Sequence, residues 1–335
     1  MPVSDVDYPR VRLAGFDVLR AAGAFAVVWI HGCDTSSLAR HLSSFAAFAV
    51  PCFVLMSFYL LQGRIMRDPA PATGPLAWQR MARLAPAYLG WTLVYLMARW
   101  LKHRTSGAGF EAEWRGWFLL GGASYQLYFV PLLVYCSVLL LPLMTWSARP
   151  GRRAMGIGMM TVLSLALLTA AIACGQQSWY QRLPFQLRQM GGMAWLAALG
   201  AVLALLFPSG IRLGCPRLSA IAPAVTGGVA LFTCIATGVE GVAFTVTMTV
   251  PVFLSALLVS EWSPPRWLTR LSALSFGIYL AHGLWVEGLQ MVAGRVGFAL
   301  ESFPATVGVI AVSFAGAWFT CEVLDRFGRV RWLVR

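Results

Sequence analysis

Charged residues are scarce in this sequence. They make up 12% of its 335 residues, against about a quarter in a typical soluble domain, and hydrophobic residues make up 59%. A helix that crosses a membrane needs roughly 20 apolar residues. The chain therefore has room for about ten spans joined by short loops, and little room for a soluble domain.

Acidic residues are also few, with 13 Asp and Glu against 26 Lys and Arg, which gives a net charge of +13. Such an excess can indicate a nucleic-acid binder. Here, however, the basic residues cluster in short segments between apolar runs, as they do in the cytoplasmic loops of membrane proteins. We expect membrane lipids, and no nucleic acid, among the partners.

Paired cysteines and metal-ligand spacings are absent from the sequence. The cysteines lie singly and mostly inside apolar runs, at Cys33, Cys52, Cys136, Cys174, Cys215, Cys234 and Cys321. This distribution is typical of small apolar packing residues and predicts no metal site. The first apolar stretch lacks a small-residue cleavage site and should stay as a span, and without internal repeats an inverted-repeat transporter is not indicated.

The apolar runs, with the polar and basic segments that separate them, predict ten helices. They are expected near 14–33, 42–62, 84–101, 123–146, 154–174, 190–207, 218–238, 241–260, 271–292 and 304–324. Two spans are needed between 218 and 260 because of length alone, with a tight turn near 239–242. The segment 110–122, FEAEWRGWFLLGG, is typical of an interfacial helix anchored by tryptophan.

Basic residues in the short loops set the expected orientation. One set of loops and termini holds Arg10, Arg12, Arg64, Arg67, Arg80, Arg83, Arg149, Arg152, Arg153, Arg212, Arg217, Arg266, Arg270, Arg326, Arg329, Arg331 and Arg335. The opposite set is smaller: Arg40, Arg99, Lys102, Arg104, Arg115, Arg182, Arg188 and Arg295. The predicted fold is an all-α integral membrane bundle of about ten transmembrane helices, with both termini cytoplasmic. It is one domain over residues 1–335, ending in a basic tail at 326–335.

The first predicted span, FDVLRAAGAFAVVWIHGCD, contains Asp17, Arg20 and His31. Ionisable residues are costly in lipid and normally face a bundle interior or a water-filled cavity. At about 100° per residue the three side chains point the same way, with His31 roughly 16 Å beyond Arg20 along the axis. This stripe predicts one wall of a polar passage. The alternative is an ion pair between Asp17 and Arg20, with His31 only capping the helix at its outer end.

Two further groups of polar residues lie at or in the predicted spans. Arg80 and Arg83 leave one helix face at i and i+3, an arrangement that suits a phosphate-bearing ligand or, alternatively, simple anchoring at the membrane surface. The span LSALSFGIYLAHGLW contains Ser275, Tyr279 and His282. Its histidine is either a satisfied core group or a residue that faces a cavity.

Together and in this order, these segments resemble the acyltransferase 3 superfamily of bacterial integral membrane acyltransferases. The stretch FDVLRAAGAFAVVWIH is similar to the family pattern LDxLRxxAxxxVxxxH, and VPCFVLMSFYLL is similar to VPxFFxLSGFLL. RMARLAPAY matches RxxRIxPxY, while YQLYFVPLLVYCSVLLLP and SFGIYLAH resemble two later patterns. One departure is Phe58, bulky where a small residue is usual, which is expected to narrow a cavity. Because no extracellular hydrolase-like domain is fused to the chain, it resembles the short, stand-alone form.

The resemblance implies an O-acyltransferase of the bacterial inner membrane that uses acyl-CoA, most commonly acetyl-CoA, as donor substrate and no permanently bound cofactor or metal. It implies an essential His31, with Arg20 in the same motif, and Arg80 and Arg83 as contacts of CoA. We add Asp17 as the expected partner of Arg20, and Tyr279 and His282 as residues that orient the thioester or the acceptor. His31 is expected to act as general base, or alternatively to carry the acyl group.

The acceptor is expected to be a hydroxyl of a cell-envelope glycan or lipid-linked sugar on the far side of the membrane. A transporter or flippase for a lipid-linked saccharide is the main alternative, since it would also need a polar passage and many helices. A purely structural scaffold would leave the ionisable residues of the first span unexplained.

Overall fold

The computed structural model describes residues 12–33, 36–68, 72–106, 114–211, 241–258 and 262–334, and these fold into helices with no strand among them. The predicted all-α architecture is confirmed for this part of the chain. The longer helices are α1 (Ala14–Gly32), α3 (Ala49–Ile65), α4 (Thr73–Ser106), α6 (Phe129–Ser147), α7 (Arg153–Gly175), α9 (Phe185–Leu206), α11 (Gly241–Leu258), α12 (Arg266–Arg295) and α13 (Phe303–Arg326). Short helical segments join them: α2 (Ser37–Ser43), η1 (Ser44–Ala46), α5 (Trp114–Leu119), η2 (Tyr125–Tyr128), α8 (Ser178–Gln181) and η3 (Arg331–Leu333).

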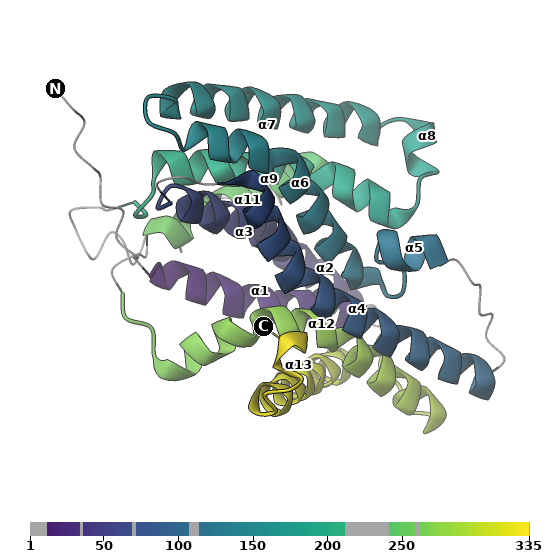
Figure 1. Cartoon of the computed structure of the whole chain (residues 1–335). Coiled ribbons are helices and arrows are strands. Elements are labelled where there is room, and N and C mark those ends of the chain that lie inside the picture. The colour runs from purple at the N-terminus through teal and green to yellow at the C-terminus, as the bar shows by residue number, and fades with distance from the viewer. Residues whose placement is uncertain are drawn as a thin grey trace.

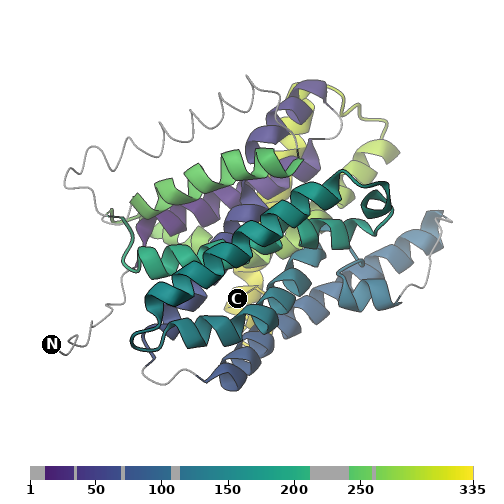
Figure 2. The same cartoon turned by 90° about the horizontal axis from the view of Figure 1, so that it is seen from above.

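Most of the long helices, α7, α9 and α11 among them, run in roughly the same direction in the view from above, whereas α13 is inclined to them (Figure 2). Helix α1 is central, because it contacts α3, α11, α12 and α13. In its most apolar stretch of 18 residues, 61% of the residues are buried. Helix α7 lies at the top edge of the bundle in Figure 1, and only 17% of the corresponding stretch is buried. In α13 the buried share is 22%. Apolar helices with so little buried surface are stable when lipid covers the rest.

Six described segments are long and apolar enough to cross a membrane. They are Ala14–Gly32, Leu38–Ile65, Tyr125–Ser147, Arg153–Gly175, Phe185–Leu206 and Phe303–Arg326. Helices α4 and α12 are longer, at 34 and 30 residues, but their polar and basic ends make them less apolar on average. Their lengths of roughly 50 and 45 Å at 1.5 Å per residue exceed the hydrocarbon thickness of about 30 Å. The count of ten spans and the cytoplasmic placement of both termini stay predictions.

Two predicted elements fall partly or wholly outside the described residues. The span expected at 218–238 lies in the stretch 212–240, which the structure does not describe, and the turn expected near 239–242 lies at its edge, where α11 begins at Gly241. Within the predicted interfacial segment 110–122, residues 114–119 form helix α5.

Close approach between helices depends on glycine at two crossings. A Cβ on Gly15 of α1 would lie 1.9 Å from the backbone oxygen of Ala256 in α11. A Cβ on Gly200 of α9 would lie 2.5 Å from the backbone oxygen of Leu55 in α3. Small residues let membrane helices pack backbone to backbone, where dispersion contacts replace the missing hydrophobic drive.

The end of the chain packs onto the bundle. The indole Nε1 of Trp91 in α4 donates a hydrogen bond of 2.9 Å to the backbone oxygen of Leu333. Val334 is fully buried against Gly277 of α12, where an added Cβ would meet its side chain at 2.7 Å. Part of the predicted basic tail is therefore fixed between α4 and α12.

Most of the described cysteines are packing residues, as predicted. Cys33, Cys52, Cys136 and Cys321 are buried, Cys174 is partly exposed, and all five are free of disulfides. Within the described residues no group of His, Cys, Asp and Glu could hold a metal ion. Cys215 and Cys234 lie outside the described residues.

Candidate active site

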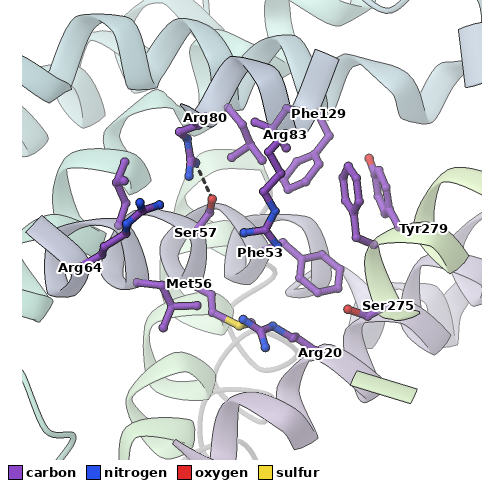
Figure 3. Close-up of a pocket in the computed structure, with 15 residues that line it drawn as sticks. Arg20, Phe53, Met56, Ser57, Arg64, Arg80, Arg83, Phe129, Ser275 and Tyr279 are labelled. Atoms are coloured by element: carbon purple, nitrogen blue, oxygen red, sulfur yellow. Dashed lines mark hydrogen bonds between the residues drawn. The ribbon is translucent and has the colours of Figure 1, made fainter. Parts of the chain in front are cut away.

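A cavity of about 240 Å³ opens between α1, α3, α4, α6 and α12, and we call it the arginine cavity (Figure 3). Its walls contain four arginines and no carboxylate. They are formed by Arg20, Phe53, Met56, Ser57, Leu60, Leu61, Arg64, Arg80, Arg83, Leu84, Phe129, Leu133, Ser275, Phe276 and Tyr279. Because arginine stays protonated, the cavity is positive and suits a ligand with several anionic groups and an apolar portion.

Arg80 is held in place by residues of two other helices. One guanidinium Nη donates to the Ser57 hydroxyl of α3 at 2.6 Å, and Nε donates to the Ser137 hydroxyl of α6 at 2.5 Å. The ring centre of Phe58 lies 5.1 Å from the guanidinium carbon of Arg80. The expectation that Phe58 narrows a cavity is therefore wrong: its side chain is fully buried beneath Arg80 and does not line the arginine cavity.

The other cavity arginines come from three different helices. Arg83 follows Arg80 by three residues on α4, so the two share one helix face, as predicted, and both line the cavity. Arg20 reaches the cavity from α1. Arg64 joins them from the last turn of α3 and donates to the Gln79 side chain at 2.5 Å. From the sequence, Arg64 was only one of the basic residues of a predicted cytoplasmic loop. Nothing in the sequence showed that α3 would end beside α4.

Asp17 makes no hydrogen bond or direct ion pair with Arg20, which corrects the alternative of an ion pair between them, but its charge still attracts the Arg20 guanidinium. Its Oδ2 accepts a 2.8 Å hydrogen bond from Nε of Arg12, and its Oδ1 accepts one of 2.6 Å from the Ser272 hydroxyl of α12. Asp17 is buried and does not line the arginine cavity. Its contacts tie α1 to α12 and to the segment before α1, so the stripe Asp17, Arg20 and His31 is not one continuous wall.

The two histidines of the predicted site lie next to each other. The rings of His31 on α1 and His282 on α12 are nearly parallel, with centres 5.3 Å apart. The Tyr125 ring of η2 lies 4.2 Å from His31 and 6.2 Å from His282, between ring centres. His282 is fully buried, whereas His31, in the last turn of α1, is partly exposed. These contacts join two segments 251 residues apart in the sequence.

The protonation of His282 follows from its hydrogen bond. Its Nδ1 lies 2.6 Å from the backbone oxygen of Tyr279, and because a carbonyl oxygen only accepts, Nδ1 must carry the hydrogen. In the neutral ring, Nε2 then bears a lone pair. This atom is buried and has no hydrogen-bond partner among the described residues. An unsatisfied buried acceptor is costly, so this atom is available to a donor group.

Tyr279 connects the histidines to the arginine cavity. Its ring lines that cavity and lies 5.9 Å from the His282 ring, centre to centre. Its hydroxyl donates a 2.7 Å hydrogen bond to the backbone oxygen of Gln126, which fixes η2 against α12. The phenol proton is therefore committed to positioning η2, and the ring lies between the arginine cavity and the His282 ring.

A second cavity, of about 400 Å³, lies beyond the histidines, and we call it the mixed-charge cavity. Its walls come from α4, α12 and the segment before α6: Tyr95, Ala98, Arg99, Lys102, Gly122, Ala123, Ser124, Tyr125, Leu284, Glu287, Gly288 and Met291. Along α12, His282 comes three residues after Tyr279 of the arginine cavity and two before Leu284 of this one. The histidine pair thus lies between the two cavities.

The other two motif residues of the RMARLAPAY segment, Pro86 and Tyr88, do not line the arginine cavity and have structural roles. Pro86 lies inside α4, and the Tyr88 hydroxyl is 2.9 and 3.0 Å from the backbone oxygens of Trp117 and Phe118. This contact fixes α5 to α4 beside the mixed-charge cavity. The segment therefore supplies two arginines to one cavity and an anchor for the walls of the other.

Comparison with known proteins shows the family of the chain. The family model described as "Acyltransferase domain" (Acyl_transf_3) matches residues 13–322, nearly the whole chain. The chain therefore belongs to this acyltransferase family, and it is a multi-pass membrane acyltransferase. No curated protein and no solved structure matches it in the same comparisons.

Proposed function

We propose that this protein transfers an acyl group, most simply acetyl, from acyl-CoA to a hydroxyl of a cell-envelope glycan or lipid-linked sugar. The donor enters from the cytoplasm of a bacterial cell and the acceptor from the far side of the inner membrane. The observation that carries the proposal is the position of the histidine pair between an arginine cavity and a mixed-charge cavity.

The arginine cavity suits the phosphate end of acyl-CoA. Several phosphate charges cannot enter hydrocarbon unaided, whereas Arg20, Arg80 and Arg83 can each form charge-assisted hydrogen bonds with them. Ligand pockets that enclose a drug-sized molecule measure about 300–1,000 Å³, so a cavity of about 240 Å³ encloses only part of the donor. The slender pantetheine arm would pass Tyr279 toward His31, roughly 16 Å beyond Arg20.

In the proposed reaction His31 acts as general base. It takes the proton of the acceptor hydroxyl as the oxygen attacks the thioester carbonyl. A new ester C–O bond forms, the C–S bond breaks, and the departing thiolate of CoA takes the proton back from the imidazolium. A covalent acyl-histidine on His31 is the alternative route to the same products.

The buried Nε2 lone pair of His282 accepts a hydrogen bond from a substrate group in this proposal. It cannot donate one to an oxyanion while Nδ1 carries the only hydrogen of the neutral ring. Two donors would fit it: the acceptor hydroxyl and an amide N–H of the pantetheine arm. Tyr279 and Asp17 act through position, the first by holding η2 and the second by holding α1 against α12.

Acyl transfer is favoured over the transporter alternative by membership of an acyltransferase family. Acyl transfer also gives the histidine pair a chemical role. Purified protein given acetyl-CoA should release CoA when envelope glycans are added, measured as free thiol. A transporter would release none.

The acceptor is identified by mass spectrometry of cell-envelope glycans from a deletion strain and its parent. We expect one acyl mass to be lost in the deletion strain and restored by the wild-type chain, and not by His31→Ala. Unchanged glycans in the deletion strain, together with no thiol release by purified protein, would contradict the proposed function.

A further inference from the structure

The mixed-charge cavity differs from an anion site in the signs of the groups that line it. Arg99 and Lys102 bring positive charge from α4, and Glu287 brings a carboxylate from α12. Both cations lie near enough to attract that carboxylate electrostatically. A strongly anionic ligand would be repelled by Glu287, and a cationic ligand by the two basic residues. Neither class fits these walls well.

A polyhydroxyl ligand fits them better, because each hydroxyl both donates and accepts a hydrogen bond. One Nη of Arg99 already donates to the backbone oxygen of Gly122 at 3.2 Å, which holds the guanidinium at the cavity wall. Its other N–H groups and the Lys102 ammonium are donors, and the Glu287 carboxylate is an acceptor. The partly exposed ring of Tyr125 adds apolar surface for the carbon face of a sugar ring.

Neither histidine lines this cavity, but one of its walls packs against His31. Tyr125 lines the cavity, and its ring centre is 4.2 Å from that of His31. The tyrosine and the preceding residue are held firmly: the Ser124 hydroxyl donates to the Gln126 side chain at 2.7 Å, and Tyr279 fixes the backbone of Gln126. A sugar lying against Tyr125 would therefore bring a hydroxyl close to the imidazole in a defined orientation.

We propose that the mixed-charge cavity is the acceptor site and that it binds a saccharide unit through Arg99, Lys102, Glu287 and Tyr125. This inference rests on the proposed acyl transfer, since it assigns the acceptor of that reaction to one set of residues. It also separates the two substrates in space, with the donor in the arginine cavity and the sugar on the other side of the histidine pair.

Two glycines of α12 offer a matched test. Gly288 lines the mixed-charge cavity, and an added Cβ there would meet no atom within 4 Å. Gly294, six residues later on the same helix, has equally open space and does not line the cavity. Gly288→Leu should extend into the acceptor site, since its Cβ would meet no neighbouring atom, whereas Gly294→Leu makes the same change of size in the last turn of α12, outside the cavity.

Both variants are expressed in the deletion strain, and acylation of envelope glycans is measured by mass spectrometry. Both are also purified, and the shift in melting temperature caused by acetyl-CoA is measured. We expect Gly288→Leu to lower the acyl mass on glycans at least tenfold and to keep the thermal shift. Gly294→Leu should keep both.

Full glycan acylation by Gly288→Leu would overturn the inference, and so would parallel loss of acylation and of the acetyl-CoA shift, because the cavity would then not serve the acceptor alone. Failure of the proposed function has a different signature: glycans of the deletion strain match those of the parent before any variant is compared.

Discussion

The two cavities lie on opposite sides of one histidine pair, yet their walls differ in charge. The arginine cavity has four guanidinium groups and no carboxylate, whereas the mixed-charge cavity sets two basic residues against Glu287. The first suits a multiply charged donor and the second a neutral, hydroxyl-rich acceptor. In the proposed reaction, this difference in charge keeps two substrates apart while both reach one imidazole.

The largest effect is expected at the junction between the cavities. His31→Ala should lower the rate of acyl transfer by roughly 100- to 10,000-fold, the range that general acid–base catalysis contributes. The measurement is CoA release by purified protein with envelope glycans as acceptor. His41→Ala is the control, because His41 is exposed on α2 and lines neither cavity. Transfer at the wild-type rate by His31→Ala would remove the histidine from the reaction.

A smaller effect is expected in the arginine cavity. Arg83→Gln should weaken acetyl-CoA binding roughly ten- to 150-fold, since a hydrogen bond to a charged group is worth about 1.5–3 kcal/mol. Titration calorimetry with CoA measures the change. Arg67→Gln, at the end of α3 but outside the cavity, should bind CoA as the wild type does. Equal binding by both variants would assign Arg83 to membrane anchoring alone.

A substitution in the mixed-charge cavity should change the kinetics of the acceptor and not the binding of the donor. Glu287→Gln is expected to raise the KM for the glycan acceptor about two- to tenfold, because a charged hydrogen-bond acceptor becomes a neutral one. The dissociation constant of CoA should not change. Glu301→Gln, on an exposed residue between α12 and α13, is the control. A Glu287→Gln variant that binds CoA more weakly and keeps its acceptor KM would reverse the assignment of the two cavities.

The smallest effect concerns the support of Arg80. Phe58→Leu removes the ring beneath the guanidinium, an interaction worth about 0.5–1 kcal/mol. CoA binding should weaken about two- to fivefold, measured by the same titration, without a change in acceptor KM. Phe319→Leu, on an exposed part of α13, controls for the loss of a ring. Equal or tighter CoA binding by Phe58→Leu would contradict the supporting role of this ring.

Local patterns were sufficient for the elements and for part of the site. The apolar run at 14–33 predicted α1, observed at Ala14–Gly32, because its length and composition match a span. The i, i+3 spacing of Arg80 and Arg83 correctly predicted a shared face, since helix geometry alone fixes it. The pairing of His31 with His282 was not predicted, because it depends on how α1 and α12 cross.

The errors have the same origin. Asp17 was assigned to Arg20 because the two are near in sequence, but Ser272 of α12 and Arg12 satisfy its carboxylate. Phe58 was expected to narrow a cavity because a small residue is usual at that place, but it follows Ser57 directly, and successive residues of a helix point about 100° apart. The mixed-charge cavity combines three segments that share no motif, and it could be found only in three dimensions.

The most direct test is a donor saturation curve measured for His31→Ala and Arg83→Gln side by side, with acceptor held constant. The predicted result is that high acetyl-CoA restores most of the wild-type rate to Arg83→Gln, whose defect is in binding, and leaves His31→Ala inactive. Recovery of His31→Ala at high donor, or a rate of Arg83→Gln that stays low at saturation, would contradict the separation of donor binding from catalysis.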